Sequence, residues 1–278
     1  MNVGIIGLGL IGGSMAKAVK ENGKHKVLGM DIQESVVCRA LLLESIDERL
    51  TDDGLSECEM AIIALYPGET IQFMREKGHL LKKNSIVLDC CGVKQNVCRQ
   101  IQPIALELGI HFVGAHPMAG MEFSGFEYAK GSLFKGASMI LTPPGDMDIR
   151  ITDRLKHFFL SLGFDHIEVT TPAKHDRVIA YTSQLAHVVS NAYVKSPRAE
   201  MHKGFSAGSY LDLTRVAKLN PDMWTELFLE NKEFLTDEIN DLIRRLKMYR
   251  DAIENDQGEE LYRLLEEGTK RKIMLDGE

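Results

Sequence analysis

The chain opens with Asn2-Val-Gly-Ile-Ile-Gly-Leu-Gly-Leu-Ile-Gly-Gly-Ser14, in which an apolar run leads directly into closely spaced glycines. The apolar run Val3 to Ile6 predicts a buried strand, and the residues after Ser14 follow a helical pattern. Between the two stands Gly7-Leu-Gly-Leu-Ile-Gly12, which matches G-x-G-x-x-G in the position that a dinucleotide-binding fold requires. The stretch therefore predicts a Rossmann-type, doubly wound and mostly parallel sheet at the amino terminus.

The glycines of this motif meet three different steric needs. Gly7 permits a tight turn, Gly9 lets a pyrophosphate approach the backbone, and Gly12 lets the helix pack closely on the strand. Leu10 and Ile11 open the helix, whose N-terminus attracts phosphate groups. These five residues form the predicted phosphate-binding part of a cofactor site.

Asp31 ends the second predicted strand, 19 residues after Gly12. A carboxylate at this position can accept hydrogen bonds from the ribose hydroxyls of NAD and would repel a 2′-phosphate. No basic residue follows it before Arg39, so the sequence favours NAD over NADP.

Composition limits the kind of protein. With 278 residues, 44% of them hydrophobic, the chain can bury the core of one large domain or two ordinary ones. The formal net charge of -7 argues against sequence-independent nucleic-acid binding. No apolar run reaches the roughly 18 to 20 residues of a membrane span, and no targeting segment is recognisable, so we expect a cytoplasmic protein that binds neither nucleic acid nor membrane. The five cysteines lack paired metal-ligand spacing, and we expect free thiols and no metal.

The chain changes its pattern near residue 168. Before it, apolar runs alternate with helical patterns, which predicts a dinucleotide-binding domain over 1–168. After it the pattern is helical; Asn220 and Pro221 suit the N-cap and first position of a helix. The apolar face from Trp224 to Leu246 is too wide for an isolated helix, so residues 169–278 are predicted to form a helical domain and a homodimer interface. The expected strands are Val3–Ile6, Lys26–Met30, Met60–Leu65, Ser85–Leu88, His111–Gly114, Ser138–Leu141 and Ile167–Thr170.

Polar groups that could complete a site follow the later strands. Asp89 to Lys94 follows the fourth strand, and His116-Pro-Met-Ala-Gly-Met-Glu122 follows the fifth. Ligands of open α/β sheets bind at these carboxyl ends of strands. A predicted helix carries a polar stripe with steps of four, and Leu213-Thr214-Arg215 precedes the next helix. The stripe consists of His175, Ser183, His187 and Asn191.

These motifs resemble those of the prephenate and arogenate dehydrogenases over nearly the whole chain. The resemblance runs from GLGLIGGS through DCCGVK, HPMAG-x-E-x-SG, HD…S-Q-L-A-H and LTR-x-A to NPDMW…ENK. It implies an NAD domain, a dimerising helical domain and an active site between them. The implied reaction belongs to tyrosine biosynthesis: prephenate gives a hydride to NAD, loses CO2 and becomes 4-hydroxyphenylpyruvate.

Matching positions imply the following roles. His116 would accept the proton of the substrate hydroxyl, and Arg215 would bind a substrate carboxylate. His187 would line the substrate pocket, Glu122 would gate it, and Lys94 would fix the loop near the nicotinamide and add positive potential. His175 and Trp224 are expected as framework, and Asn231 as a partner of buried backbone groups.

Two pocket positions depart from the family pattern. Gly92 stands where relatives commonly have serine, and Gln184 stands where they often have histidine; both are predicted to line the substrate pocket. Three other readings stay open at this point. They are arogenate as the substrate, a reductase like the β-hydroxyacid dehydrogenases, and a non-catalytic NAD-binding sensor.

Overall fold

A computed structural model describes residues 1–121 and 123–277 of the chain. They form two compact units, Met1–Asn231 and Lys232–Glu278. The sheet and the helices that follow it, up to residue 231, thus belong to one unit. The domain boundary at residue 168 stays a prediction from the sequence pattern.

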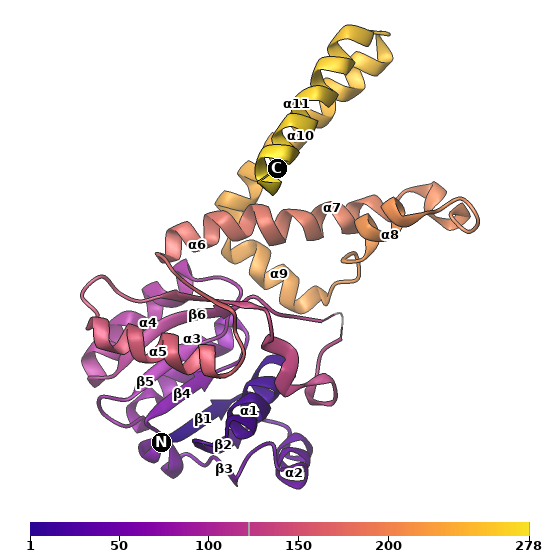
Figure 1. Cartoon of the computed structure of the whole chain (residues 1–278). Helices are drawn as coiled ribbons and strands as arrows, with labels where there is room; N and C mark the ends of the chain where they lie inside the picture. Colours follow the sequence, from indigo (N-terminus) through magenta and orange to yellow (C-terminus); the bar gives the residue numbers. More distant parts are fainter. Residues whose placement is uncertain (122, 278) are drawn as a thin grey trace. The chain divides into compact units, whose positions relative to one another are not determined.

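The first unit is built on an eight-stranded, mostly parallel sheet, as the glycine motif predicts (Figure 1). Among the strands formed by the described residues, neighbouring pairs are parallel except for β6 with β7. The order around β1 places the point where the chain changes direction beside the glycine loop, which is where such sheets bind ligands. In spatial order the strands are β3 (Glu48–Arg49), β2 (Lys26–Met30), β1 (Asn2–Ile6), β4 (Met60–Ile63), β5 (Ile86–Asp89), β6 (His111–Pro117), β7 (Ser138–Thr142) and β8 (His166–Val169).

Helices cover both faces of this sheet and make two separate cores. Alternate strand residues point to opposite faces, so that Ile5 packs with α1, α2 and α5 while Ile6 packs with α3 and α4. Strands buried on both faces explain the nearly continuous apolar runs of the sequence. These helices are α1 (Leu10–Asn22), α2 (Glu34–Leu42), α3 (Pro67–Lys77), α4 (Gln95–Leu108) and α5 (Ile149–Ser161).

Strand β6 is longer than the sequence pattern predicts. Its expected end was Gly114, but antiparallel pairing with β7 continues to Pro117, and His116 lies opposite Ile140. The pairing with β7 supplies backbone partners that the local sequence does not reveal. His116 is therefore held by a strand, which is a stiffer support than the loop expected there.

Helices follow the sheet within the same unit, and α6, η5 and α7 form one continuous rod (Figure 1). Asn220 caps α9 as predicted, since its side chain accepts hydrogen bonds from Asp222 N at 3.0 Å and Met223 N at 3.3 Å. The expected apolar helix beyond Trp224 is interrupted at Asn231, which ends α9. The bounds are α6 (Pro172–Ile179), the π-helical η5 (Ala180–Leu185), α7 (Ala186–Tyr193), α8 (Gly208–Thr214) and α9 (Pro221–Glu230).

All five cysteines are free thiols, as expected. Burial raises the pKa of Cys58 to about 11, of Cys90 to about 12 and of Cys98 to about 11. The pKa of buried Cys91 is likewise raised, whereas Cys38 is exposed. At neutral pH these four thiols are therefore held in the protonated, unreactive form, Cys58 and Cys91 in the core and Cys90 and Cys98 at half-buried positions.

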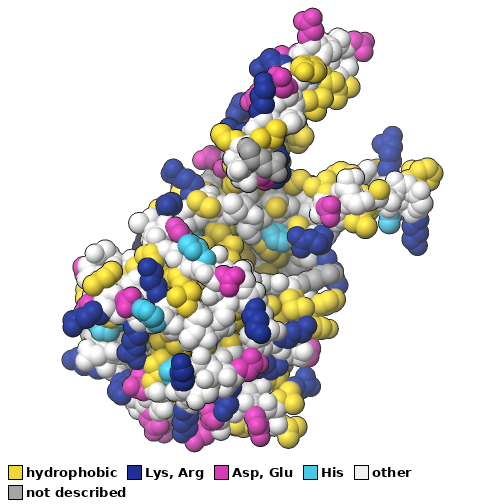
Figure 2. Space-filling view, in the orientation of Figure 1, with side chains coloured by type: hydrophobic (Ala, Val, Ile, Leu, Met, Phe, Trp, Pro, Cys, Tyr) yellow, Lys and Arg dark blue, Asp and Glu magenta, His cyan; other side chains and the backbone are white. Residues whose placement is uncertain are grey.

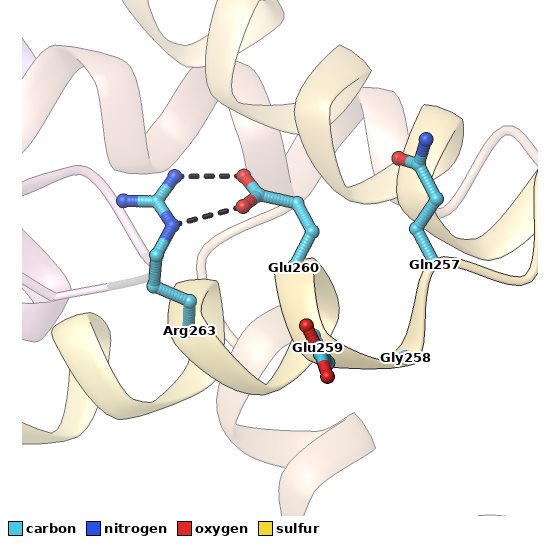
Figure 3. A pocket seen from close by; sticks show the side chains of 5 residues that line it. All are labelled: Gln257, Gly258, Glu259, Glu260 and Arg263. Carbon is cyan, nitrogen blue, oxygen red and sulfur yellow. Dashed lines mark hydrogen bonds and ion pairs between the residues drawn. The ribbon is translucent and has the colours of Figure 1, made fainter.

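The second unit is a helical hairpin of α10 (Lys232–Glu254) and α11 (Gly258–Asp276). Apolar side chains remain exposed on both helices, among them Leu246 and Tyr262 (Figure 2). A hollow at the turn between the helices is lined by charged side chains, of which Arg263 and Glu260 pair with each other (Figure 3). Across the described residues, no helix is both long and apolar enough to cross a membrane.

Candidate active site

The glycine loop has the geometry of a phosphate-binding turn. Gly7 adopts a φ of 86°, which favours glycine, and its N–H donates to Met30 O at 2.9 Å. A Cβ on Gly12 would lie 1.8 Å from Gly7 O, so the first turn of α1 packs against the loop with no room for a side chain. A Cβ on Gly9 would meet nothing within 4 Å. The loop therefore leaves open the approach that a pyrophosphate needs.

The amino terminus of α1 is free to bind an anion. Its N-cap, Gly9, offers no side chain to the first N–H groups of the helix, and such groups attract phosphate. Asp31 fixes the loop from the end of β2, because its carboxylate accepts Leu8 N at 2.8 Å and Gln33 N at 2.9 Å. The residues present fit a dinucleotide with an unphosphorylated adenosine ribose.

Two histidines and a buried carboxylate form a chain of hydrogen bonds at the end of β6. His116 Nδ1 lies 2.9 Å from His175 Nε2, and His175 Nδ1 lies 2.7 Å from Asp176 Oδ1. Asp176 also accepts Lys94 N at 2.7 Å and Gln95 N at 2.8 Å, and so caps α4. A single carboxylate thus links α6, the start of α4 and the strand that carries His116.

The order of donors and acceptors fixes the tautomers of both rings. An ionised carboxylate only accepts, so His175 donates through Nδ1 and accepts at Nε2. His116 must then donate through Nδ1, which leaves its Nε2 with a lone pair. Within residues 1–121 and 123–277, no group is bonded to that nitrogen, and His116 keeps part of its surface accessible. The chain therefore presents a proton acceptor.

The surroundings keep these rings neutral. Burial lowers the pKa of His116 well below its ordinary value, and positive charge on a protonated His175 or on Lys94 acts in the same direction. Burial also lowers the pKa of His175, although its bond to Asp176 opposes that shift. At neutral pH the imidazole of His116 is consequently unprotonated and able to act as a base.

Lys94 lies inside the protein and its ammonium group bonds to Asp89, with both side chains fully buried. Burial disfavours the charge, but Asp89 raises the Lys94 pKa above its ordinary value. Asp89 also accepts Cys91 N at 3.0 Å and Ala115 N at 3.1 Å. The pair ties the loop after β5 to the strand that carries His116, so Lys94 supports the site from within and has no free ammonium for a ligand.

A second group of polar residues lies on α7 and beside α8. The ring centroids of His187 and Trp224 are 4.0 Å apart, and His187 Nδ1 lies 3.1 Å from Val216 O. Burial lowers the pKa of His187, and the adjacent charge of Arg215 lowers it further. Arg215 is exposed, and none of the described side chains accepts a hydrogen bond from its guanidinium. The two predicted ligands are therefore neighbours, and the cation is available.

Gln184 is buried and does not offer its amide to a ligand. Its Nε2 donates to Leu227 O at 3.1 Å, and its Oε1 accepts from Asn231 Nδ2 at 2.7 Å. Asn231 Nδ2 also donates to Asp176 O at 2.9 Å, which agrees with the expected backbone role of this residue. Gln184 therefore serves the framework, and its predicted contact with substrate has no geometric support.

Gly92 faces α9, because a Cβ there would lie 3.3 Å from a methyl group of Leu227. Glu122, the expected gate, lies outside the described residues. Two groups were undervalued by sequence reasoning: His175 was assigned to the framework, and Asp176 was given no role. The His-Asp pair lies three and four residues after the Pro of a Thr-Pro helix start, and a carboxylate there could have been suspected as an inward-facing partner.

Comparisons with known proteins agree over both halves of the chain. The model of the prephenate dehydrogenase nucleotide-binding domain matches residues 15–168, and that of the prephenate dehydrogenase dimerization domain matches residues 171–267. A prephenate dehydrogenase from Bacillus subtilis (strain 168) is 33% identical over 93% of this chain and 72% of its own. A cyclohexadienyl dehydrogenase from Zymomonas mobilis is 30% identical over 99% of this chain and 96% of its own.

Solved structures give the same picture. Prephenate dehydrogenase from A. aeolicus, in complex with hydroxyphenyl propionate and NAD+, matches with a TM-score of 0.87 at 31% identity, covering 99% of this chain and 98% of its own. An arogenate dehydrogenase from Synechocystis matches with a TM-score of 0.83 at 26% identity, covering 99% and 100%.

Proposed function

The chain belongs to the prephenate dehydrogenase family, and from that premise we propose that it catalyses the NAD-dependent oxidative decarboxylation of prephenate to 4-hydroxyphenylpyruvate. The observation that carries the proposal is the chain Asp176–His175–His116, which ends in an unprotonated Nε2. His116 lies on β6, and the carboxyl end of β6 is at the same edge of the sheet as the glycine loop.

His116 manages the proton of the substrate hydroxyl. Bound NAD would supply the acceptor for the hydride that leaves C4 of the ring. As that hydride leaves, the hydroxyl proton passes to His116 Nε2. The bond to the ring carboxylate then breaks, its electron pair enters the ring, CO2 departs, and the new phenol oxygen recovers the proton. His116 therefore ends the cycle in the same protonation state in which it began. Positioned acid/base catalysis of this kind raises the reaction rate roughly 100- to 10,000-fold.

Arg215 and His187 supply the binding of the substrate's anionic side chain. A planar guanidinium suits a carboxylate, and Arg215 is exposed beside His187. Lys94 and Asp89 hold the loop and strand that fix His116. For the cofactor, Gly7, Gly9, Gly12 and the first N–H groups of α1 would hold the pyrophosphate, and Asp31 the ribose.

Assembly as a homodimer follows from the same premise. The matched dimerization domain includes most of the hairpin α10–α11, which exposes large apolar side chains on both of its helices. Burying them against a second copy would remove apolar area from water.

NADH formation with prephenate tests the proposal, with CO2 release measured in parallel. His116→Asn should lower kcat at least about 100-fold, since positioned acid/base catalysis is worth that much, while the KM for NAD changes little. His111→Asn, at the other end of β6, is the control and should behave like the wild type. An active His116→Asn variant would refute the proton-acceptor role, and a wild type that forms no NADH would refute the activity.

Arogenate is the second candidate, because relatives with either substrate have this fold. Its side chain carries an amine in place of the keto group, and the proton transfer at His116 would be the same. The ratio of kcat/KM for prephenate and arogenate decides between them. We expect prephenate to be preferred, and a ratio below one would assign the chain to the arogenate branch.

A further inference from the structure

The helix that carries His175 and His187 contains one turn that is wider than an α-helix. Residues Ala180–Leu185 form the π-helical segment η5 between α6 and α7. A π turn holds one residue more than an α turn, and such turns are frequent at functional sites. Because the wide turn lies between His175 and His187, its effect on the angle between these two residues around the helix axis can be calculated.

The extra residue changes the face on which His187 lies. In a regular α-helix each residue turns by about 100°, so twelve residues would separate His175 and His187 by about 120° around the axis. The wide turn accommodates one of these residues without adding to the rotation, so the angle between His175 and His187 around the axis falls to about 20°. The steps of four in the sequence do not align these residues by themselves, since each step drifts by about 40°.

Asn231 and Gln184 hold the wide turn in place. Gln184 belongs to η5, and its side chain is only 1% exposed. Asn231, 3% exposed, donates to Asp176 O before the turn and to Gln184 Oε1 inside it. One side-chain amide therefore bridges the turn, and Gln184 Nε2 anchors it to Leu227 O on α9.

We propose that the π turn of η5, clamped by Asn231 and Gln184, is the device that brings His187 onto the face of His175, so that both histidines serve one site. Asn231 and Gln184 are thus positioning residues. The assignment of that site to substrate rests on the proposed function, but the geometric claim does not. The geometric claim makes a specific prediction about chain length: one residue can be removed from the turn, and His187 and His175 should still lie on the same face of the helix.

Deletion and insertion at the same point test this statement. Tyr181 and Thr182 are exposed and lie inside η5. Deleting Thr182 turns the segment into a regular helix and leaves His187 about 20° from His175. Inserting one alanine between Tyr181 and Thr182 instead rotates His187 by about 100°, which moves its Cα by roughly 3.5 Å. We therefore expect the deletion to be tolerated and the insertion to be harmful.

The first measurement does not depend on activity. The chain has one tryptophan, Trp224, and its ring contacts His187. Protonation of a contacting imidazole changes tryptophan emission, so a fluorescence titration below pH 6.5 should report His187 in the wild type, and His187→Asn should abolish the step. The deletion variant should keep the step and the insertion variant should lose it. The inference is overturned if the insertion variant keeps it or the folded deletion variant loses it.

The second measurement uses turnover of prephenate. The insertion should lower kcat/KM at least about 100-fold, because displacements of about 1 Å can cost that much, and the deletion should stay within about tenfold. A wild type that is inactive but shows the fluorescence pattern would refute the proposed function alone. Active enzyme with equal losses in both length variants would refute the π-turn inference alone.

A substitution covers the case in which a length variant does not fold. Asn231→Asp keeps the shape of the side chain but replaces both donated hydrogen bonds by a carboxylate facing two oxygens. It should raise the KM for prephenate at least about tenfold and weaken the fluorescence step, with the KM for NAD unchanged. Exposed Asn240→Asp is the matched control. Wild-type values in Asn231→Asp would overturn the clamp.

Discussion

Replacing Asp176 by asparagine should disable the proton acceptor without touching it. Three donors converge on this carboxylate: His175 Nδ1, Lys94 N and Gln95 N. An amide keeps one accepting oxygen and turns an NH2 group toward at least one of the donors. His175 loses the partner that fixes its tautomer, so that His116 can carry its proton on Nε2 and cannot accept another.

The magnitude follows from these bonds. Hydrogen bonds to a charged group contribute about 1.5–3 kcal/mol each, so a weakened set should lower the free energy of unfolding by about 2–4 kcal/mol. The tautomer change should lower kcat by about 100- to 10,000-fold, the range that acid/base catalysis supplies. The KM for NAD should remain near the wild-type value, because Asp176 caps α4 and has no contact with the glycine loop among the described residues.

Initial rates of NADH formation at saturating prephenate and NAD measure the effect, and urea unfolding measures the stability. Asp148→Asn is the matched control: Asp148 also caps a helix, accepting Arg150 N at 2.9 Å, but is remote in sequence and lies at α5. Asparagine caps helices about as well as aspartate. A kcat for Asp176→Asn within threefold of the wild type would refute the tautomer argument, whatever its stability.

Three further outcomes follow from the same geometry. Gly9→Ala should leave the urea midpoint unchanged and raise the Kd for NAD at least about tenfold, because the added Cβ contacts no protein atom and extends into the space where the pyrophosphate would bind. Gly12→Ala should instead destabilise the fold, because there is no room for a Cβ at that position. Equal shifts of the urea midpoint in the two variants would contradict this. Arg215→Ala should raise the KM for prephenate about 10- to 100-fold at unchanged melting temperature, since charge-assisted bonds are worth about 1.5–3 kcal/mol. His116, His175 and His187 have lowered pKa values in the folded protein. As the pH falls, the unfolded chain therefore binds protons before the folded protein does, and the free energy of unfolding should decrease below about pH 6.5. A rise in the urea midpoint in that range would exclude this linkage.

The nucleotide half could be predicted from the sequence because its determinants are local. A strand, three glycines and an acidic residue stand within about thirty positions, and each has one steric reason to be where it is. The long-range part could not be predicted in the same way. His116 and His175 are 59 residues apart, and the direction of His116 is fixed by long-range contacts such as the antiparallel pairing of β6 with β7.

The remaining differences between the sequence predictions and the structure concern which polar side chains are buried. Gln184 was expected to line the substrate pocket, but its side chain lies inside the protein and bonds to Asn231. Lys94 was expected to fix the loop near the nicotinamide and add positive potential, and its ammonium group is buried against Asp89. A sequence pattern shows that a residue is polar but not whether its partner is a ligand or another buried group. The resemblance to known dehydrogenases supplied the position of His116 and Arg215. It did not supply the wide turn, because helical periodicity alone gives no sign of an extra residue.

The inert thiols make the folded protein behave as though it had a single cysteine. Cys58 and Cys91 are buried, and half-buried Cys90 and Cys98 are held as protonated thiols by their raised pKa values, so exposed Cys38 on α2 should be the thiol that reacts at neutral pH. A maleimide dye should therefore attach at one position, on the nucleotide-binding side, without prior mutagenesis. The same property turns a count of labelled thiols into a gauge of unfolding, since the number of dyes per chain rises above one only when the core opens.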